Sequence, residues 1–169
     1  LSLPLAVFSR EKTLSFKVIK TFPHEAGLFT QGLEIDGDIL FESGGGYGSS
    51  VLLAKKLSTQ KVLYQKKLES KFFAEGLTVF NNHIYLLTWK EKLGMILNKK
   101  NFKLIDTFTY KTEGWGLAHS DEGFLIMSDG SEYLYIRKPP EFKVHRKIRV
   151  KGGDGEAVKN INELEYVNG

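Results

Sequence analysis

Four side chains that could act together on a small ligand stand at equivalent places in this sequence, each just before a Gly-Leu or Glu-Leu pair. They are Gln31, Glu75, Trp115 and Asn162, which supply two amides, a carboxylate and an indole. A carboxylate can transfer a proton, an amide can hydrogen-bond a carbonyl or an oxyanion, and an aromatic ring can enclose an apolar chain. If the fold brings these residues together, the chemistry they favour is proton transfer on a bound small molecule.

Aromatic residues near these positions would supply the apolar walls of such a site. We expect this role for Phe29, Phe73 and Trp89, because small-ligand sites are mostly apolar with a few convergent polar groups. Glu75 is the candidate proton-transfer group, since a carboxyl group beside aromatic rings loses hydration and its pKa rises. Glycines flanked by aromatic residues also pack the cores of β-proteins, so a purely structural role is the alternative.

The elements that must position these residues belong to an internal repeat. The pairs Gly32-Leu33, Gly76-Leu77, Gly116-Leu117 and Glu163-Leu164 follow one another at steps of about 40 to 47 residues. Each of the first three pairs opens a series of four short segments rich in β-branched and aromatic residues and separated by turn residues. The predicted strands cover 33–35, 39–42, 51–54 and 61–64, then 77–80, 84–89, 94–97 and 103–108, then 117–118, 124–127, 133–136 and 142–145.

Four antiparallel strands per repeat are typical of the blades of a β-propeller. A single predicted strand at 16–20 precedes the first unit, and 164–167 resembles the first strand of a further unit. We therefore predict an all-β, five-bladed propeller of four-stranded antiparallel blades, of which this chain holds about three blades plus single strands at both ends. A sandwich or barrel with coincidental spacing is the alternative, but it gives no reason for the repeated Gly-Leu pairs.

Composition limits the class of protein further. We interpret residues 1–15 as an N-terminal arm or a signal-peptide remnant and 16–169 as a partial propeller domain. The apolar stretch at 1–8 is far shorter than the roughly 20 residues that span a bilayer, so we expect no membrane span. The net charge of +4 is mild and spread along the chain, which argues against a nucleic-acid partner. The absence of cysteine excludes disulfides, thiol catalysis and cysteine-based zinc sites.

Six ordered motifs make the sequence similar to the glutamine cyclotransferase family, from about residue 16 to 169. The resemblance implies a glutaminyl-peptide cyclotransferase of the plant and bacterial type, a transferase that converts the N-terminal glutamine of peptides to pyroglutamate and releases ammonia. The motifs are Phe-Thr-Gln-Gly-Leu-Glu at 29–34, Glu-Gly-Leu-Thr at 75–78, Leu-Thr-Trp-Lys at 87–90, Gly-Trp-Gly-Leu at 114–117, Ser-Asp-Gly-Ser at 128–131 and Asn-Glu-Leu-Glu at 162–165.

The resemblance also implies roles for individual residues. Glu75 would transfer the proton, and the substrate would be bound by Phe29, Gln31, Phe73, Trp89, Trp115 and Asn162. The family has a further tryptophan and a later lysine in its C-terminal part, and neither can be placed in a chain that ends at Gly169.

The expected partners are peptides or proteins with an N-terminal glutamine, the expected location is secreted or periplasmic, and the full-length protein is expected to be a monomer. No cofactor or catalytic metal is expected, although the resemblance allows a structural calcium ion. The histidines are scattered without ligand spacing, so we expect surface or turn positions for them and no zinc site: His24, His83, His119 and His145. A non-catalytic propeller that binds a peptide or glycan is the main alternative, and a scaffold of the WD-repeat or kelch kind is a weaker one.

Overall fold

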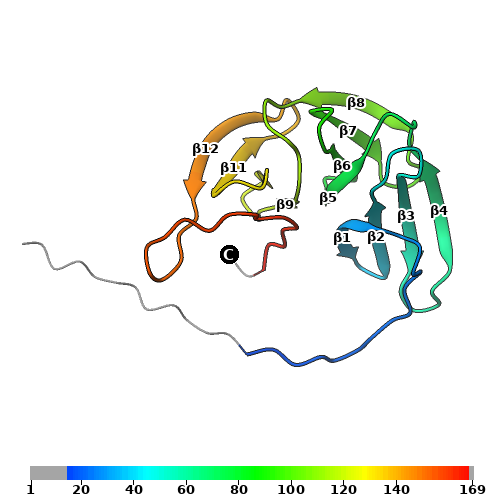
Figure 1. The fold of residues 1–169 in the computed structure, drawn as a ribbon. Coiled ribbons are helices and arrows are strands. Elements are labelled where there is room, and N and C mark those ends of the chain that lie inside the picture. The colour runs from blue at the N-terminus through cyan, green and yellow to red at the C-terminus, as the bar shows by residue number, and fades with distance from the viewer. Residues whose placement is uncertain (1–14, 168–169) are drawn as a thin grey trace, which may run out of the picture.

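The structure, a computed structural model, describes residues 15–167, which contain twelve strands and no helix (Figure 1). The strands form three antiparallel sheets of four, each ordered as in the chain. Blade 1 holds β1 (Thr30–Asp36), β2 (Ile39–Gly44), β3 (Val51–Lys56) and β4 (Val62–Lys67). Blade 2 holds β5 (Ala74–Phe80), β6 (His83–Thr88), β7 (Leu93–Asn98) and β8 (Leu104–Thr109). Blade 3 holds β9 (Leu117–His119), β10 (Leu125–Met127), β11 (Tyr133–Lys138) and β12 (Lys143–Arg149).

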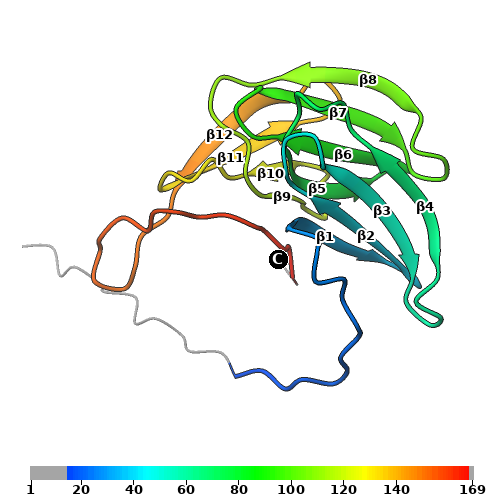
Figure 2. The ribbon, with the colours of Figure 1, turned by 45° about the vertical axis from the view of Figure 1, so that its right-hand side comes forward.

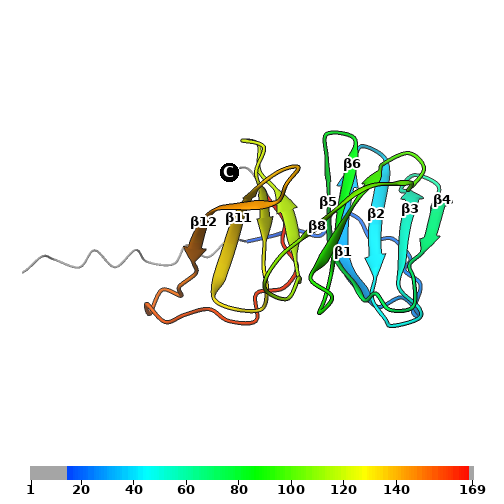
Figure 3. The same cartoon turned by 90° about the horizontal axis from the view of Figure 1, so that it is seen from above.

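The three blades are arranged radially, with β1, β5 and β9 innermost and β4, β8 and β12 at the rim (Figures 1 and 2). Blade 2 lies between the other two, as the view from above shows (Figure 3). This arrangement confirms the predicted all-β propeller architecture and the predicted order of strands within each unit. No helix in the described part of the chain is long and apolar enough to cross a bilayer.

Tight turns fix the register within each blade. Asn81 and Asn82 join β5 to β6 with φ angles of 48° and 64°, so both central residues of this two-residue hairpin are left-handed. Such a turn matches the twist of the paired strands, and asparagine tolerates the left-handed conformation better than most residues. This turn separates β5 from β6, as expected between the strands predicted at 77–80 and 84–89.

Blade 2 is buried on both faces, which explains why its inner strands are almost continuously apolar. Successive side chains of a strand point to opposite faces. On β6, Ile84 and Leu86 pack toward blade 1, where Phe41 and Leu52 meet them. The intervening Tyr85 and Leu87 pack toward blade 3 in a second cluster, together with Phe108, Leu117, Met127 and Phe142.

The repeated glycines allow the innermost strands to approach one another closely. A Cβ atom at Gly32 would lie 2.6 Å from the Leu77 backbone nitrogen, and one at Gly76 would lie 2.5 Å from the Trp115 backbone oxygen. A Cβ at Gly116 would lie 2.0 Å from the Asn162 backbone oxygen. The Gly76 N–H also donates a 2.7 Å hydrogen bond to the Trp115 carbonyl, directly between two blades. Glycine recurs in the Gly-Leu pairs because the inner strands pack too closely at the propeller axis for a Cβ atom.

Two predicted single strands are wrong in the described structure. Residues 16–20 and 164–167 run as irregular chain and pair with no strand. A strand needs a neighbour to satisfy its backbone N–H and C=O groups, and the described residues offer neither segment one. Phe16 and Ile19 are accordingly more than 90% exposed, at 91% and 93%. The predicted arm or signal-peptide remnant at 1–15 lies outside the described residues, except for its last position.

Replacing Gly76 with alanine tests the steric role of the axial glycines. The added methyl group would meet backbone atoms that cannot move independently, so we expect Gly76→Ala to lower the free energy of unfolding by about 1–3 kcal/mol, measured by urea denaturation. Gly27→Ala is the matched control, because no atom lies within 4 Å of the position that its methyl group would take and its φ is not in the left-handed region. Equal losses in the two variants would show that close approach at the axis is not what requires glycine.

Candidate active site

One open pocket of about 310 Å³ lies where the inner strands begin, and residues that follow β6 and blade 3 complete its lining. Its lining consists of the seven residues predicted from the sequence: Phe29, Gln31, Phe73, Glu75, Trp89, Trp115 and Asn162. The structure therefore brings all predicted site residues together, from three blades and from the segment that follows blade 3. Their individual chemical roles remain predictions.

Two β-bulges direct the polar side chains of the pocket. The β1–β2 register shifts between Thr30 and Gly32, and the β5–β6 register shifts between Ala74 and Leu77. Gln31 and Glu75 lie within these irregular stretches. Bulges re-aim side chains and are common beside active sites, so the same local device presents the amide and the carboxylate to the pocket.

Asn162 is held by backbone contacts with blade 3 although it belongs to no strand. The Ser128 hydroxyl donates a 2.7 Å hydrogen bond to the Asn162 carbonyl and accepts one of 2.7 Å from the Gly116 N–H. The Asn160 N–H donates to the Gly130 carbonyl at 2.8 Å. These bonds fix the segment against the inner end of blade 3, which explains how a residue outside the sheets reaches the pocket.

The apolar walls form a connected aromatic group centred on Phe73. Its ring centroid lies 6.3 Å from that of Phe29 and 5.4 Å from that of Trp89, both in edge-to-face geometry. The ring of Tyr47, which is outside the set of seven predicted site residues, also lies 5.4 Å from that of Phe73. A Cβ atom at Gly45 would lie 2.2 Å from the Phe73 ring, so glycine makes room for this wall. Phe29, Phe73 and Trp89 of this group line the pocket and form its apolar wall.

Glu75 is buried, with 5% of its surface exposed, and its pKa is raised from 4.5 to about 8. Burial is the largest cause, followed by the negative charges of Glu163, Glu113 and Glu91. Burial also raises the pKa of Glu163 to about 8, although its side chain still reaches solvent and accepts a 3.1 Å hydrogen bond from the Leu33 N–H. The pocket therefore holds a carboxyl group that changes charge near neutral pH.

Two carboxylates beside the pocket were not predicted. Glu113 accepts hydrogen bonds from both indole N–H groups, at 2.7 Å from Trp89 and 3.0 Å from Trp115. Glu91 accepts from the Tyr47 hydroxyl at 2.8 Å and from the Phe73 N–H at 3.4 Å. Each lies two residues from a tryptophan, a proximity that could have identified them, but neither stands directly before a Gly-Leu pair.

Further along the inner strands a polar cluster corrects the interpretation of one histidine. His119 lies in β9, half-buried, and its Nδ1 is 2.9 Å from the Thr78 hydroxyl and 3.7 Å from a Glu34 carboxylate oxygen. Glu34 also accepts a 3.0 Å hydrogen bond from the Val79 N–H, and burial raises its pKa. His119 therefore links blades and is neither a turn nor a free surface residue. No group of three or more metal-ligating side chains occurs among residues 15–167.

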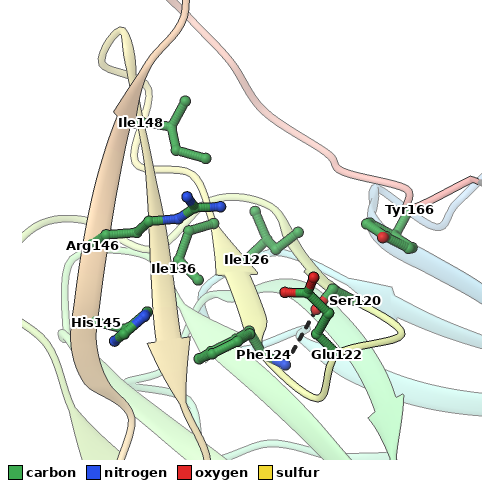
Figure 4. Close-up of a pocket in the computed structure, with 9 residues that line it drawn as sticks. All are labelled: Ser120, Glu122, Phe124, Ile126, Ile136, His145, Arg146, Ile148 and Tyr166. Atoms are coloured by element: carbon green, nitrogen blue, oxygen red, sulfur yellow. Dashed lines mark hydrogen bonds between the residues drawn. The ribbon is translucent and has the colours of Figure 1, made fainter. Parts of the chain in front are cut away.

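A larger hollow of about 470 Å³ lies on the face of blade 3 that is turned away from blade 2, and it shares no residue with this site (Figure 4). Its floor is formed by Ile126, Ile136 and Ile148. His145 stacks on Phe124 with ring centroids 5.0 Å apart. In Figure 4 the only hydrogen bond drawn joins the Phe124 N–H to the Ser120 hydroxyl, and these side chains resemble a packing face more than a reaction centre.

Comparison with known proteins gives consistent matches to one family. The model of the glutamine cyclotransferase family matches residues 3–169. The glutaminyl-peptide cyclotransferase of Arabidopsis thaliana is 38% identical over 154 residues, which are 90% of this chain and 48% of the relative. The crystal structure of Myxococcus xanthus glutaminyl cyclase superposes with a TM-score of 0.81 at 34% identity, covering 90% of this chain and 64% of that one.

More distant structures share the architecture alone. The WD40 domain of Pan2 from Neurospora crassa superposes with a TM-score of 0.60 at 10% identity, over 73% of this chain and 36% of that one. Such a match supports the propeller fold and carries no information on function. The chain spans about half the length of the curated relative and 64% of the solved bacterial structure.

The raised pKa of Glu75 predicts a pH-dependent cost to stability. The folded state binds this proton more tightly than the unfolded chain, so ionising Glu75 lowers stability as pH rises from about 4.5 to 8. The neutral Glu75→Gln variant avoids the cost, and we expect its unfolding free energy relative to wild type to increase by about 1–3 kcal/mol between pH 5 and 9.

Urea denaturation at several pH values measures this difference. Glu122→Gln is the control, because Glu122 is exposed and lies in a turn of blade 3 away from the site pocket. Parallel pH profiles for wild type and Glu75→Gln would contradict a buried carboxyl group that titrates near pH 8.

Proposed function

Because the chain belongs to the glutamine cyclotransferase family, we propose that the protein is a glutaminyl-peptide cyclotransferase that converts N-terminal glutamine into pyroglutamate. The observation that carries the proposal is the buried carboxyl group of Glu75, set among aromatic walls and two amides in one pocket. The substrates are peptides or proteins that begin with glutamine.

The reaction makes a specific demand on proton transfer. The α-amine of the substrate attacks the carbonyl carbon of its own side-chain amide, a new C–N bond closes the ring, and the original amide C–N bond breaks to release ammonia. A free α-amine has a pKa of about 7.7–8.0, so at neutral pH much of it must lose a proton before it can attack. A carboxylate whose pKa lies near 8 is well matched to take that proton and return it to the leaving nitrogen.

The remaining pocket residues suit the other requirements of cyclisation. Gln31 and Asn162 line the pocket, and in this proposal they hydrogen-bond the substrate amide and then the oxyanion of the tetrahedral intermediate. The rings of Phe29, Phe73, Trp89 and Trp115 enclose the glutamine side chain in the folded shape that ring closure needs. Holding both reacting groups in that geometry removes much of the entropic barrier.

The proposed reaction requires no cofactor, because the nucleophile and the leaving group belong to the same substrate molecule. We further propose a secreted or periplasmic location and a monomeric full-length protein, both on the basis of family resemblance. A structural calcium ion stays a proposal of the same kind, and no step of the reaction depends on it.

The Glu75→Gln variant tests the proposed catalytic role in the full-length protein. Losing the proton-transfer group is expected to lower ammonia release from a glutamine-initiated dipeptide by a factor of about 10² to 10⁴, measured with a coupled ammonia assay. Binding of the dipeptide, measured by calorimetry, should persist because the aromatic walls are unchanged.

Glu122→Gln serves again as the control and should turn over normally. Near-normal turnover by Glu75→Gln would reject the assignment of Glu75. If the wild-type protein binds the dipeptide but releases no ammonia, the propeller is a peptide-binding module and the enzymatic proposal fails.

A further inference from the structure

We propose that Glu113 is a positioning residue that holds both tryptophan walls of the pocket in their working orientation. This role rests on the proposed function, since it matters for catalysis only if Trp89 and Trp115 enclose a substrate. The residue was not part of the predicted site, does not line the pocket and is identified only by its contacts.

A single carboxylate oxygen joins two walls that come from different blades. Oε2 of Glu113 accepts hydrogen bonds from the indole nitrogens of Trp89, at 2.7 Å, and of Trp115, at 3.0 Å. Trp89 follows β6 in blade 2, and Trp115 leads into β9 of blade 3. The two indoles therefore share one anchor, and a movement of Glu113 would move both sides of the pocket.

The backbone around this anchor is already fixed. The Gly114 N–H donates to the Trp89 carbonyl at 3.0 Å, and the Trp115 N–H donates to the Ser128 carbonyl at 3.1 Å. A Cβ atom at Gly114 would lie 2.7 Å from the Thr88 carbonyl oxygen, so this loop sits tightly against the end of β6. With the main chain held, the freedom left to each tryptophan is rotation of its side chain, which the bond to Glu113 restrains.

A carboxylate suits this position for a chemical reason. An indole N–H can only donate, and a partly buried one needs an acceptor. A carboxylate oxygen has two lone pairs and can accept from both rings, and hydrogen bonds to an ionised acceptor are about twice as strong as neutral ones. The Lys90 ammonium also lies 3.8 Å from the Trp89 ring centroid, a contact that further limits that ring.

The same carboxylate has a second, separable effect on the site. When ionised, Glu163, Glu113 and Glu91 raise the pKa of Glu75, and they come from the segment after blade 3, the β8–β9 loop and the β6–β7 loop. Removing one of them should lower the pKa of Glu75. The acceptor role and the charge role of Glu113 can therefore be tested independently, because glutamine retains an acceptor oxygen and loses the charge.

The first test uses intrinsic fluorescence of the 169-residue chain, whose two tryptophans are both in this group. In Glu113→Ala the indoles lose their common acceptor, so we expect emission to move to longer wavelength and near-ultraviolet circular dichroism to weaken. Glu113→Gln should retain most of both signals. Glu91→Gln is the matched control, since Glu91 bonds Tyr47 and Phe73 and neither indole.

The second test uses turnover of a glutamine-initiated dipeptide by the full-length protein. Glu113→Ala is expected to raise KM about 10- to 100-fold with a smaller change in kcat, because the walls bind substrate and transition state alike. Glu113→Gln should restore KM to within about threefold of wild type and shift the pH profile of kcat/KM to lower pH, as Glu91→Gln should.

The outcomes separate this inference from the proposed function. Unchanged emission and unchanged KM in a folded Glu113→Ala variant would overturn the positioning role. If Glu113→Ala does not fold, Glu113→Gln becomes the deciding variant. In that case the positioning role is overturned if Glu113→Gln loses as much of the indole signals as was expected for Glu113→Ala. If wild-type protein releases no ammonia, the proposed function fails, and the positioning role is still judged by the fluorescence of the variants.

Discussion

The close approach of the innermost strands sets the arrangement of the three blades and of the pocket that they share. At Gly32, Gly76 and Gly116 the backbone of one inner segment touches that of the next, with no room for a side chain. This contact aligns the beginnings of the inner strands, and the residues just before the three glycines therefore meet. A pocket built from three blades and a following segment is thus a consequence of packing at the axis.

The composition of that pocket lowers the stability of the folded protein. The carboxyl group of Glu75 is buried in a pocket lined by aromatic rings, and the charges of three further glutamates raise its pKa. A sequence selected for stability alone would replace Glu75 by an uncharged residue, since burying a charge is costly. Local conflicts of this kind are expected at functional sites, where a perturbed pKa serves the chemistry. The aromatic walls differ from Glu75 in this respect, because their packing contributes to stability while they shape the pocket.

Much of the fold and of the pocket lining could be predicted because both follow from a repeated pattern. The Gly-Leu pairs identified the inner strands of the three blades, and the residue before each pair was correctly predicted to line the pocket. Glu113, Glu91 and Tyr47 could not be found in this way, because their roles come from side-chain bonds between loops and leave no periodic signal. The segments 16–20 and 164–167 have strand-like composition, but strand formation depends on a pairing partner that composition cannot supply. His119 was misassigned for a similar reason, since its partners Thr78 and Glu34 lie on other blades.

A nuclear magnetic resonance titration shows whether blade packing creates one shared pocket. The isotope-labelled chain carrying Glu75→Gln, which should not consume the ligand, is titrated with a dipeptide that begins with glutamine. If the pocket is shared, the indole N–H signals of Trp89 and Trp115 and the backbone amide signals of Gly76 and Gly116 shift along a single saturation curve. Shifts confined to the hollow of blade 3 lined by Ile126, Ile136 and Ile148 would contradict a shared pocket. The absence of any shift in the two indole and two glycine signals would contradict it as well.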